Sequence, residues 1–265
     1  MIVLSGLIFL SNRIILIIGL FLVFGHNLFD NISAQGIGFL DRLWIILHQP
    51  NVIILNGRVV DAFYPVMPLI GLMALGYVFG NLYKKEFSAN QRRIYLLSIG
   101  FAATLLFILL RGFNLYGEPT IWGTQGTQIF TWMSFLNVTK YPMSLQFILM
   151  TIGPALIFLL LADSWTLKPS HPFLTFGRVP FFFYVLHLYL IHALALVFLI
   201  VSGRDWHQYI LSASSLQSGA LIDFGLELGW VYLIWVLVLV ILYPLCLWYQ
   251  NYKHNNPNKW WLGYI

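Results

Sequence analysis

Charged residues and cysteine are both scarce in this chain. Of its 265 residues, 9% are charged and 60% are hydrophobic, and the mean hydropathy is +0.81. Soluble domains carry roughly 25% charged residues, so the composition excludes a soluble globular protein and predicts an integral membrane protein. The single cysteine, Cys246, excludes an intrachain disulfide and a cysteine-based metal site, and it leaves the redox compartment open.

The excess of basic residues does not indicate a nucleic-acid-binding protein. The formal net charge is +5, but the lysines and arginines lie beside apolar runs, where the positive-inside rule accounts for them. We therefore expect a lipid bilayer as partner and no nucleic acid. No internal repeat, low-complexity tract or Pro/Gly/Ser linker divides residues 1–265, so the sequence favours one polytopic membrane domain.

Apolar runs between charged residues predict six membrane crossings. The runs cover roughly residues 14–29, 63–83, 93–111, 143–163, 178–202 and 224–248. The predicted fold class is an all-α integral membrane protein with about six transmembrane helices and long outer loops. Residues 1–10 are apolar but too short to span, which is typical of part of a helix; a short interfacial or re-entrant segment is the alternative.

The distribution of lysine and arginine predicts the orientation. Basic residues concentrate in the short connections and in the C-terminal tail, so that side, including the C-terminus, is expected to face the cytoplasm. Three long connections then face outward, at roughly residues 30–62, 112–142 and 203–223. Loops of this length are more often functional than idle.

Glycine and proline patterns predict how two of the helices pack. Gly76 and Gly80 form a small-xxx-small pair that favours close helix approach, and Gly71 lies about one turn earlier. Gly153 and Pro154 fall in the middle of another span, so a kink is expected there. Packing is a better explanation of both features than ligand binding.

Candidate catalytic residues lie at the predicted outer ends of the helices. His26 and Asp30 are four residues apart at the end of the first span, where a shared helix face would let the carboxylate orient the imidazole. This arrangement is typical of a general base or an acyl carrier, and a polar helix cap is the alternative. Glu118, in the second long loop, is a further candidate general base.

The second long loop also offers polar and aromatic side chains of the kinds that bind sugars. The candidate substrate-binding residues are Arg111, Asn114, Tyr116, Asn137, Lys140 and Tyr141. Amides, phenols and cationic groups suit a polyhydroxyl ligand, although a solvated loop has a similar composition.

Histidines within the fifth span do not predict a metal site. His187 and His192 are five residues apart, about 140° around a helix, so they do not share one compact site on this helix, and structural hydrogen bonding is favoured. Arg178 begins the same span on the cytoplasmic side, where either snorkelling to the interface or an anionic group would satisfy its guanidinium. We expect it to contact a phosphate-bearing donor. No metal is predicted.

Several longer segments together resemble a known family. In order, they are GHNLFD, YPVMPLIGLMALGYVFG, RGFNLYGEP, SFLNVTKYPMSLQFILMTIGPAL and FGRVPFFFYVLHLYLIH. This set resembles the C-terminal part of bacterial membrane proteins of the heparan-alpha-glucosaminide N-acetyltransferase-like group, over nearly the whole chain. The resemblance implies a multi-helix acyltransferase of the bacterial inner (plasma) membrane, with cytosolic acetyl-CoA as donor and an amino sugar as acceptor.

The family pattern also implies that N-terminal helices are missing here. Family members begin with an arginine-glycine motif and an Asp-His pair that nothing in this chain matches, so a truncated reading frame or an internally assigned start is expected. The family's acyl-carrying histidine lies in that region, and its role is not carried over to His26 or His187.

Three hypotheses for the function follow. The first is an acyltransferase acting on an envelope saccharide, with His26, Asp30 and Glu118 as catalytic candidates and Arg178 at the donor. The second is a transporter or channel for a small polar solute, although inverted repeats and buried carboxylates are not apparent in the sequence. The third is a non-catalytic membrane subunit. A homo-oligomer is left open.

Overall fold

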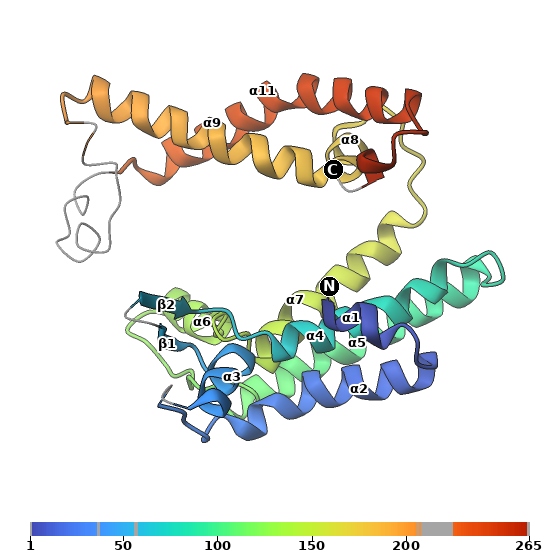
Figure 1. The fold of residues 1–265 in the computed structure, drawn as a ribbon, viewed down its shortest axis with the longest axis vertical. Helices are drawn as coiled ribbons and strands as arrows, with labels where there is room; N and C mark the ends of the chain where they lie inside the picture. The colour runs from blue at the N-terminus through green and yellow to red at the C-terminus, as the bar shows by residue number, and fades with distance from the viewer. Residues whose placement is uncertain (1, 36–37, 56–57, 206, 208–224, 264–265) are drawn as a thin grey trace. The chain divides into compact units, whose positions relative to one another are not determined.

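The computed structural model describes residues 2–35, 38–55, 58–205, 207 and 225–263 (Figure 1). Contacts within the chain form two compact units, Met1–Trp165 (unit 1) and Thr166–Ile265 (unit 2), and each is described by itself. The outer loop expected at 203–223 lies almost wholly outside the described residues. The expectation of a single membrane domain rested on the absence of a linker and stays a prediction.

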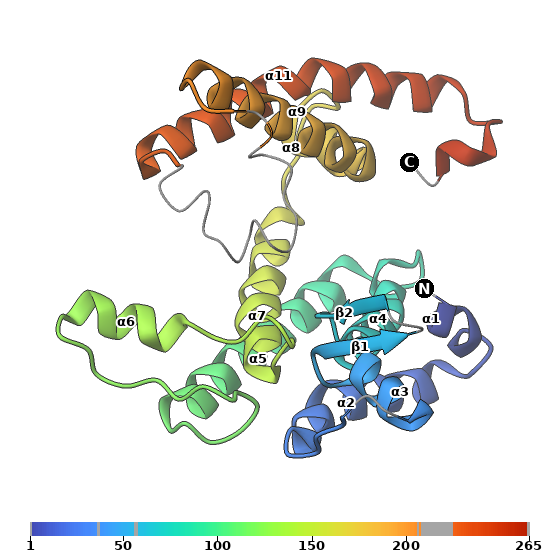
Figure 2. The same ribbon diagram turned by 60° about the vertical axis from the view of Figure 1, so that its left-hand side comes forward.

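Unit 1 combines helices with one β-hairpin. Its elements are α1 (Ile2–Leu7), α2 (Asn12–Gly25), η1 (His26–Phe29), α3 (Phe39–Leu47), β1 (Asn51–Leu55), β2 (Arg58–Ala62), α4 (Met67–Phe79), η2 (Gly80–Tyr83), α5 (Ala89–Gly112), α6 (Gln128–Leu136) and α7 (Leu145–Ala162). The strands pair antiparallel, with Asn51 opposite Ala62 and Leu55 opposite Arg58. The hairpin lies beside α3 in both views (Figures 1 and 2), where the sequence predicted only a loop.

Unit 2 is a pair of long helices with short elements at one end. Its described elements are α8 (Pro172–Arg178), α9 (Pro180–Val201), α11 (Leu228–Asn255) and η4 (Trp260–Gly263). α9 and α11 run side by side in opposite directions (Figure 1). Leu262 of η4 is buried against Val179 and Cys246, so the C-terminal tail folds back onto this helix pair.

Five helical segments among the described residues are long and apolar enough to cross a bilayer. They are Asn12–Phe29, Ala89–Gly112, Leu145–Ala162, Pro180–Val201 and Leu228–Asn255. The sixth predicted span, 63–83, is apolar but shorter, because its helix begins only at Met67 after the hairpin. The protein is therefore an all-α integral membrane protein, as its composition predicts.

A pair of glycines allows α2 and α4 to approach closely. A β-carbon added to Gly71 would lie 2.8 Å from Leu22 Cβ, and one added to Gly19 would lie 2.8 Å from a Leu75 methyl group. Nothing lies within 4 Å of a β-carbon built on Gly76 or Gly80. Of the three glycines that the sequence singled out on this helix, Gly71 lies at the contact and the Gly76–Gly80 pair does not, because the periodicity does not reveal which face meets the neighbour.

The second close helix pair is α5 with α7. A β-carbon on Gly153 would lie 2.5 Å from Thr104 Oγ1, so this glycine permits the contact, and α7 continues as helix through Pro154. Where α7 ends, the Arg92 guanidinium donates to both carboxylate oxygens of Asp163 at 2.9 to 3.1 Å. These hydrogen bonds hold the pKa of Asp163 below its usual range. The ion pair therefore joins the ends of the two helices.

Candidate functional site

The connections 26–66 and 113–144 meet at the same ends of α2, α4, α5 and α7, a region that we call the loop end of unit 1. The Tyr116 hydroxyl donates to the Phe24 carbonyl at 2.6 Å, and the rings of Tyr64 and Tyr141 pack edge to face with their centroids 4.8 Å apart. Most of the candidate residues lie here. The contact between Tyr64 and Tyr141 joins the two long connections, which the sequence did not predict.

His26 is buried at the loop end and held by backbone carbonyls on both sides. Its side chain is 2% exposed. Nδ1 lies 2.9 Å from the Val23 oxygen and 3.1 Å from the Leu22 oxygen, while Nε2 lies 3.0 Å from the Met143 oxygen. Both nitrogens are engaged, and His26 has none left for a substrate.

The predicted pairing of His26 with Asp30 is wrong. Residues 26–29 form the 3₁₀ helix η1, which has about three residues per turn, so side chains four apart do not share a face. The Asp30 carboxylate instead pairs with His48, with Oδ1 3.1 Å from Nε2. The structure therefore replaces a local pair with one that joins η1 to the end of α3.

His48 is the residue that the sequence argument missed. Its side chain is 5% exposed, and its ring packs against Trp44 and Phe29 at centroid distances of 5.0 and 6.4 Å. Among the described residues, Nδ1 has no hydrogen-bond partner. Burial lowers the pKa of the His48 imidazole, although the neighbouring Asp30 carboxylate acts in the opposite direction. Trp44 and His48 are four residues apart in the sequence, and this spacing is the one local signal of the contact between their rings.

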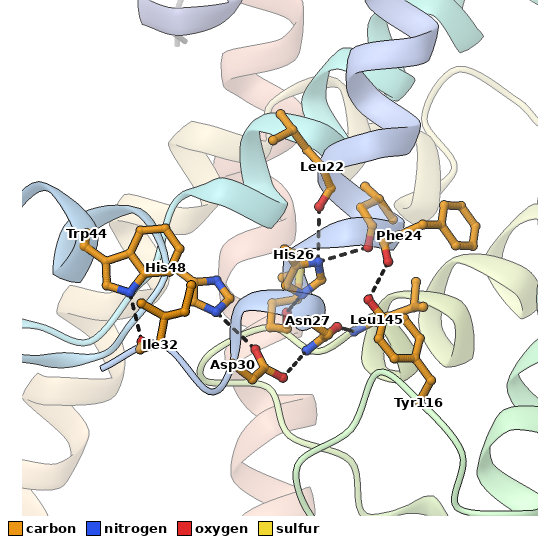
Figure 3. A network of polar contacts seen from close by, with 12 residues as sticks. Leu22, Phe24, His26, Asn27, Asp30, Ile32, Trp44, His48, Tyr116 and Leu145 are labelled. Atoms are coloured by element: carbon orange, nitrogen blue, oxygen red, sulfur yellow. Dashed lines mark hydrogen bonds and ion pairs between the residues drawn. The ribbon is translucent and has the colours of Figure 1, made fainter. Parts of the chain in front are cut away.

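A continuous chain of hydrogen bonds connects α7 to His48 (Figure 3). The Leu145 N–H donates to Asn27 Oδ1 at 3.0 Å, and Asn27 Nδ2 donates to Asp30 Oδ2 at 2.9 Å. Asp30 Oδ1 then accepts from His48 Nε2. Because Asn27 uses one end of its amide for each neighbour, the Asp30 carboxylate has a fixed orientation. An imidazole held in this way by a carboxylate can accept a proton at its other nitrogen.

Glu118 organises its own loop. Oε1 accepts from the hydroxyls of Thr120 at 2.7 Å and Thr139 at 2.5 Å, and Oε2 accepts from the Thr139 N–H at 2.9 Å and the Ser144 hydroxyl at 2.7 Å. Burial alone would raise the pKa of Glu118, but these hydrogen bonds outweigh it and hold that pKa below its usual range. A carboxylate so fully engaged is a weak base, and the geometry favours a structural role over the predicted catalytic one.

Arg111 is also used internally. Its side chain is 1% exposed, and the guanidinium donates to the carbonyls of Ser134, Phe135 and Asn137 at 2.8 to 3.0 Å. These carbonyls close α6, whose last turn lacks intrahelical donors. A fourth hydrogen bond of 2.7 Å goes to the Thr120 carbonyl. Arg111 is therefore a buried cap of α6 rather than an open saccharide contact.

Three other predicted binding residues also support the loop. The Asn114 side chain and the Trp122 backbone exchange two hydrogen bonds of 3.1 Å, and Asn114 adopts a positive φ of 50°. Tyr116 holds α2 through its hydroxyl, as described above, and Asn137 is the C-cap residue of α6. Their side chains or backbone groups build the loop end instead of lining an opening.

Lys140 and Tyr141 are, like Asn114 and Asn137, exposed predicted binding residues, and their side chains lie together. Lys140 Nζ lies 5.0 Å from the centroid of the Tyr141 ring, which is 50% exposed. The Tyr141 side chain has a lowered pKa, caused first by its hydrogen bond with Lys140 and then by its hydrogen bond with Tyr64. Two tyrosine rings and an ammonium group thus form an open polar and aromatic surface that suits the face of a sugar ring.

The remaining candidates lie in unit 2. Arg178 ends α8 and is exposed, and its Nη1 donates to the Pro169 carbonyl at 3.4 Å. His187 and His192 each place Nδ1 near the carbonyl of the residue four before, at 3.2 and 2.7 Å. No group of histidine, cysteine, aspartate and glutamate side chains able to hold a metal occurs among the described residues.

Comparisons with known proteins identify no relative of the chain. No family model matches it, and neither a curated protein nor a solved structure matches it significantly. The functional argument therefore starts from the geometry of the loop end and from the sequence segments quoted above.

Proposed function

We propose that the protein is a membrane acyltransferase that moves an acyl group from an acyl-CoA donor to a hydroxyl or amino group of an envelope saccharide. The observation that carries the proposal is the buried His48 imidazole, which is oriented by Asp30 and has a free nitrogen. A carboxylate-oriented imidazole is a common general base in acyl transfer. The resemblance of the five sequence segments to the N-acetyltransferase-like group supports the same reaction.

His48 would act as the base through Nδ1. Because Nε2 donates its hydrogen to Asp30, the lone pair of the neutral ring is on Nδ1. This nitrogen would take the proton of the acceptor as the acceptor oxygen or nitrogen attacks the acyl carbonyl carbon. The Asp30 carboxylate would stabilise the imidazolium, and the proton would pass to the departing thiolate. The ring is 5% exposed, so acceptor binding has to shift Trp44 or Phe29.

The donor and acceptor would meet different surfaces of the chain. When bound, acetyl-CoA supplies an activated acyl group; its phosphates fit the exposed guanidinium of Arg178, which donates one long hydrogen bond within the described residues. The acceptor would stack on Tyr64 and Tyr141 beside Lys140. In a bacterial plasma membrane with a cytoplasmic C-terminus, as the basic residues predict, the loop end would face outward, so the thioester of a cytosolic donor would have to enter the membrane to reach His48.

Transfer of label from acetyl-CoA tests the proposal. Membranes containing the chain, or the chain with any in-frame upstream coding sequence, are compared with empty membranes on glucosamine-type and mixed envelope saccharides. Acyl transfer above the empty-membrane level with one acceptor class is expected. Uptake of the same saccharides into proteoliposomes without acylation would contradict the proposal and favour a transporter. If neither acylation nor uptake occurs with any form, acyl transfer to these saccharides is rejected in favour of a non-catalytic subunit.

A further inference from the structure

Unit 2 contains a polar pocket of about 480 Å³ that is lined in part by Arg178, the residue proposed above to contact the donor. It lies between the end of α8 and the last turns of α11, and Val179 forms part of its wall. Arg178, Lys253 and His254 all line it, together with the amides of Gln250 and Asn251. None of the described residues that line it carries a carboxylate. Two permanent cations and an imidazole around one cavity favour an anionic ligand.

The guanidinium of Arg178 makes fewer hydrogen bonds than those of Arg92 and Arg111. Arg92 makes three hydrogen bonds to Asp163, and Arg111 makes four to carbonyls. Within the described residues, Arg178 donates only to the Pro169 carbonyl, and that contact is 3.4 Å long. A guanidinium has five N–H donors in a planar fork that matches phosphate oxygens.

The pocket has fixed walls. The Gln250 side chain is 8% exposed and donates from Nε2 to the Pro169 carbonyl at 3.3 Å, and the Tyr243 hydroxyl donates to the Ser170 carbonyl at 2.5 Å. Val179 is fully buried beneath them. The buried Gln250 Oε1 has no hydrogen-bond partner among the described residues.

The depth of the pocket in the membrane is indicated by the aromatic residues around it. Trp248 and Trp260 are 60% and 78% exposed, close in sequence to Lys253 at the end of the last apolar helix. Exposed tryptophans beside basic residues are typical of the membrane–water interface, the level at which phospholipid phosphates lie. Basic pockets at this level are suited to anionic headgroups.

We infer that this pocket binds a phosphate group through Arg178 and Lys253. The phosphate belongs to the headgroup of an anionic lipid or to a soluble phosphate ester, two sources of the same chemistry. The inference does not depend on acyl transfer, because a lipid phosphate can occupy the pocket in a membrane protein of any function. No covalent step is involved.

Native mass spectrometry and ligand titration of the full chain in detergent test the inference. The probes are phosphatidylglycerol, with phosphatidylcholine as the zwitterionic comparison, and coenzyme A as the soluble phosphate ester. We expect saturable binding of one phosphatidylglycerol or one coenzyme A per chain, in preference to phosphatidylcholine. Preference for the lipid assigns the headgroup, and displacement of the lipid by coenzyme A assigns the soluble ester.

Variants distinguish the pocket from diffuse surface charge. Arg178→Gln and Lys253→Gln should each weaken binding by roughly tenfold or more, since each removes charge-assisted hydrogen bonds. Lys168→Gln is the matched control, because Lys168 is an exposed cation of the same unit that does not line the pocket. Equal weakening by Lys168→Gln, or no saturable binding of either probe, would overturn the inference. Unchanged melting of each variant establishes that folding is intact, and Lys253→Gln gives an independent test if Arg178→Gln misfolds.

Discussion

Replacing Arg111 by methionine tests the assignment of this residue as the cap of α6. The substitution keeps an unbranched side chain of similar length but removes four hydrogen bonds to carbonyls. Each unsatisfied buried acceptor costs roughly 1–3 kcal/mol. Several α6 residues are exposed, so water can reach some of the freed carbonyls, and the apolar side chain avoids the cost of burying a charge. We therefore expect a loss of about 3–5 kcal/mol, the cost of leaving two of the four acceptors unsatisfied at roughly 1.5–2.5 kcal/mol each.

Hydrogen exchange of the detergent-solubilised protein measures this loss locally. The amides of α6 should exchange roughly a hundredfold or more faster in Arg111→Met, because about 1.4 kcal/mol corresponds to a factor of ten. Arg13→Met is the control, since Arg13 is exposed and lies at the start of α2, away from α6. Unchanged protection of α6 in Arg111→Met would refute the reasoning, as would an equal effect of Arg13→Met.

Three further predictions concern packing and pH. Gly71→Ala should destabilise the protein by about 1–3 kcal/mol through its 2.8 Å clash with Leu22, whereas Gly76→Ala meets open space and should be neutral or stabilising in the same thermal melt. Asp163→Asn should lower the melting temperature and abolish a pH dependence of stability. The pKa of Asp163 is depressed in the folded protein. The stabilisation by its carboxylate is therefore complete above the unfolded-state pKa and is lost as pH falls through the folded-state pKa. An equally steep acid melt in Asp163→Asn would contradict this. In the wild type, the amides of residues 113–144 should lose protection from hydrogen exchange as pH falls, because the pKa of Glu118 is also depressed, and Glu118→Gln should remove this pH dependence. An unchanged acid profile in the variant would exclude the role of Glu118 in the loop.

The membrane-spanning helices were predictable because the bilayer imposes a length and a composition that a single sequence reveals. The predicted runs 93–111 and 143–163 correspond closely to α5 and α7. The hairpin at 51–62 was not predicted, because its strands lie in a loop that was defined only by the lack of a long apolar run. The strands, NVIIL and RVVDA, are rich in β-branched residues, a strand signal that a search for long apolar runs does not use.

The candidate site was predictable in its location but not in its pairings. The four-residue spacing of His26 and Asp30 predicted that they share an α-helical face, but residues 26–29 form a 3₁₀ helix, in which side chains four apart point in different directions. His48 reaches Asp30 from another helix, a contact that local spacing does not encode. For Arg111, the partners are backbone carbonyls, which every residue possesses, so no side-chain pattern identifies them.

The most direct test of the proposed chemistry compares His48→Gln with His26→Gln in the labelled acyl-transfer assay, for whichever form of the chain is active. The account predicts that His48→Gln lowers the rate roughly a hundredfold or more at an unchanged melting temperature. The wild-type rate should rise with pH through a pKa below that of an ordinary histidine, because burial favours the neutral ring. His26→Gln should reduce stability along with activity. A His48→Gln variant with the wild-type rate and pH profile would contradict the account.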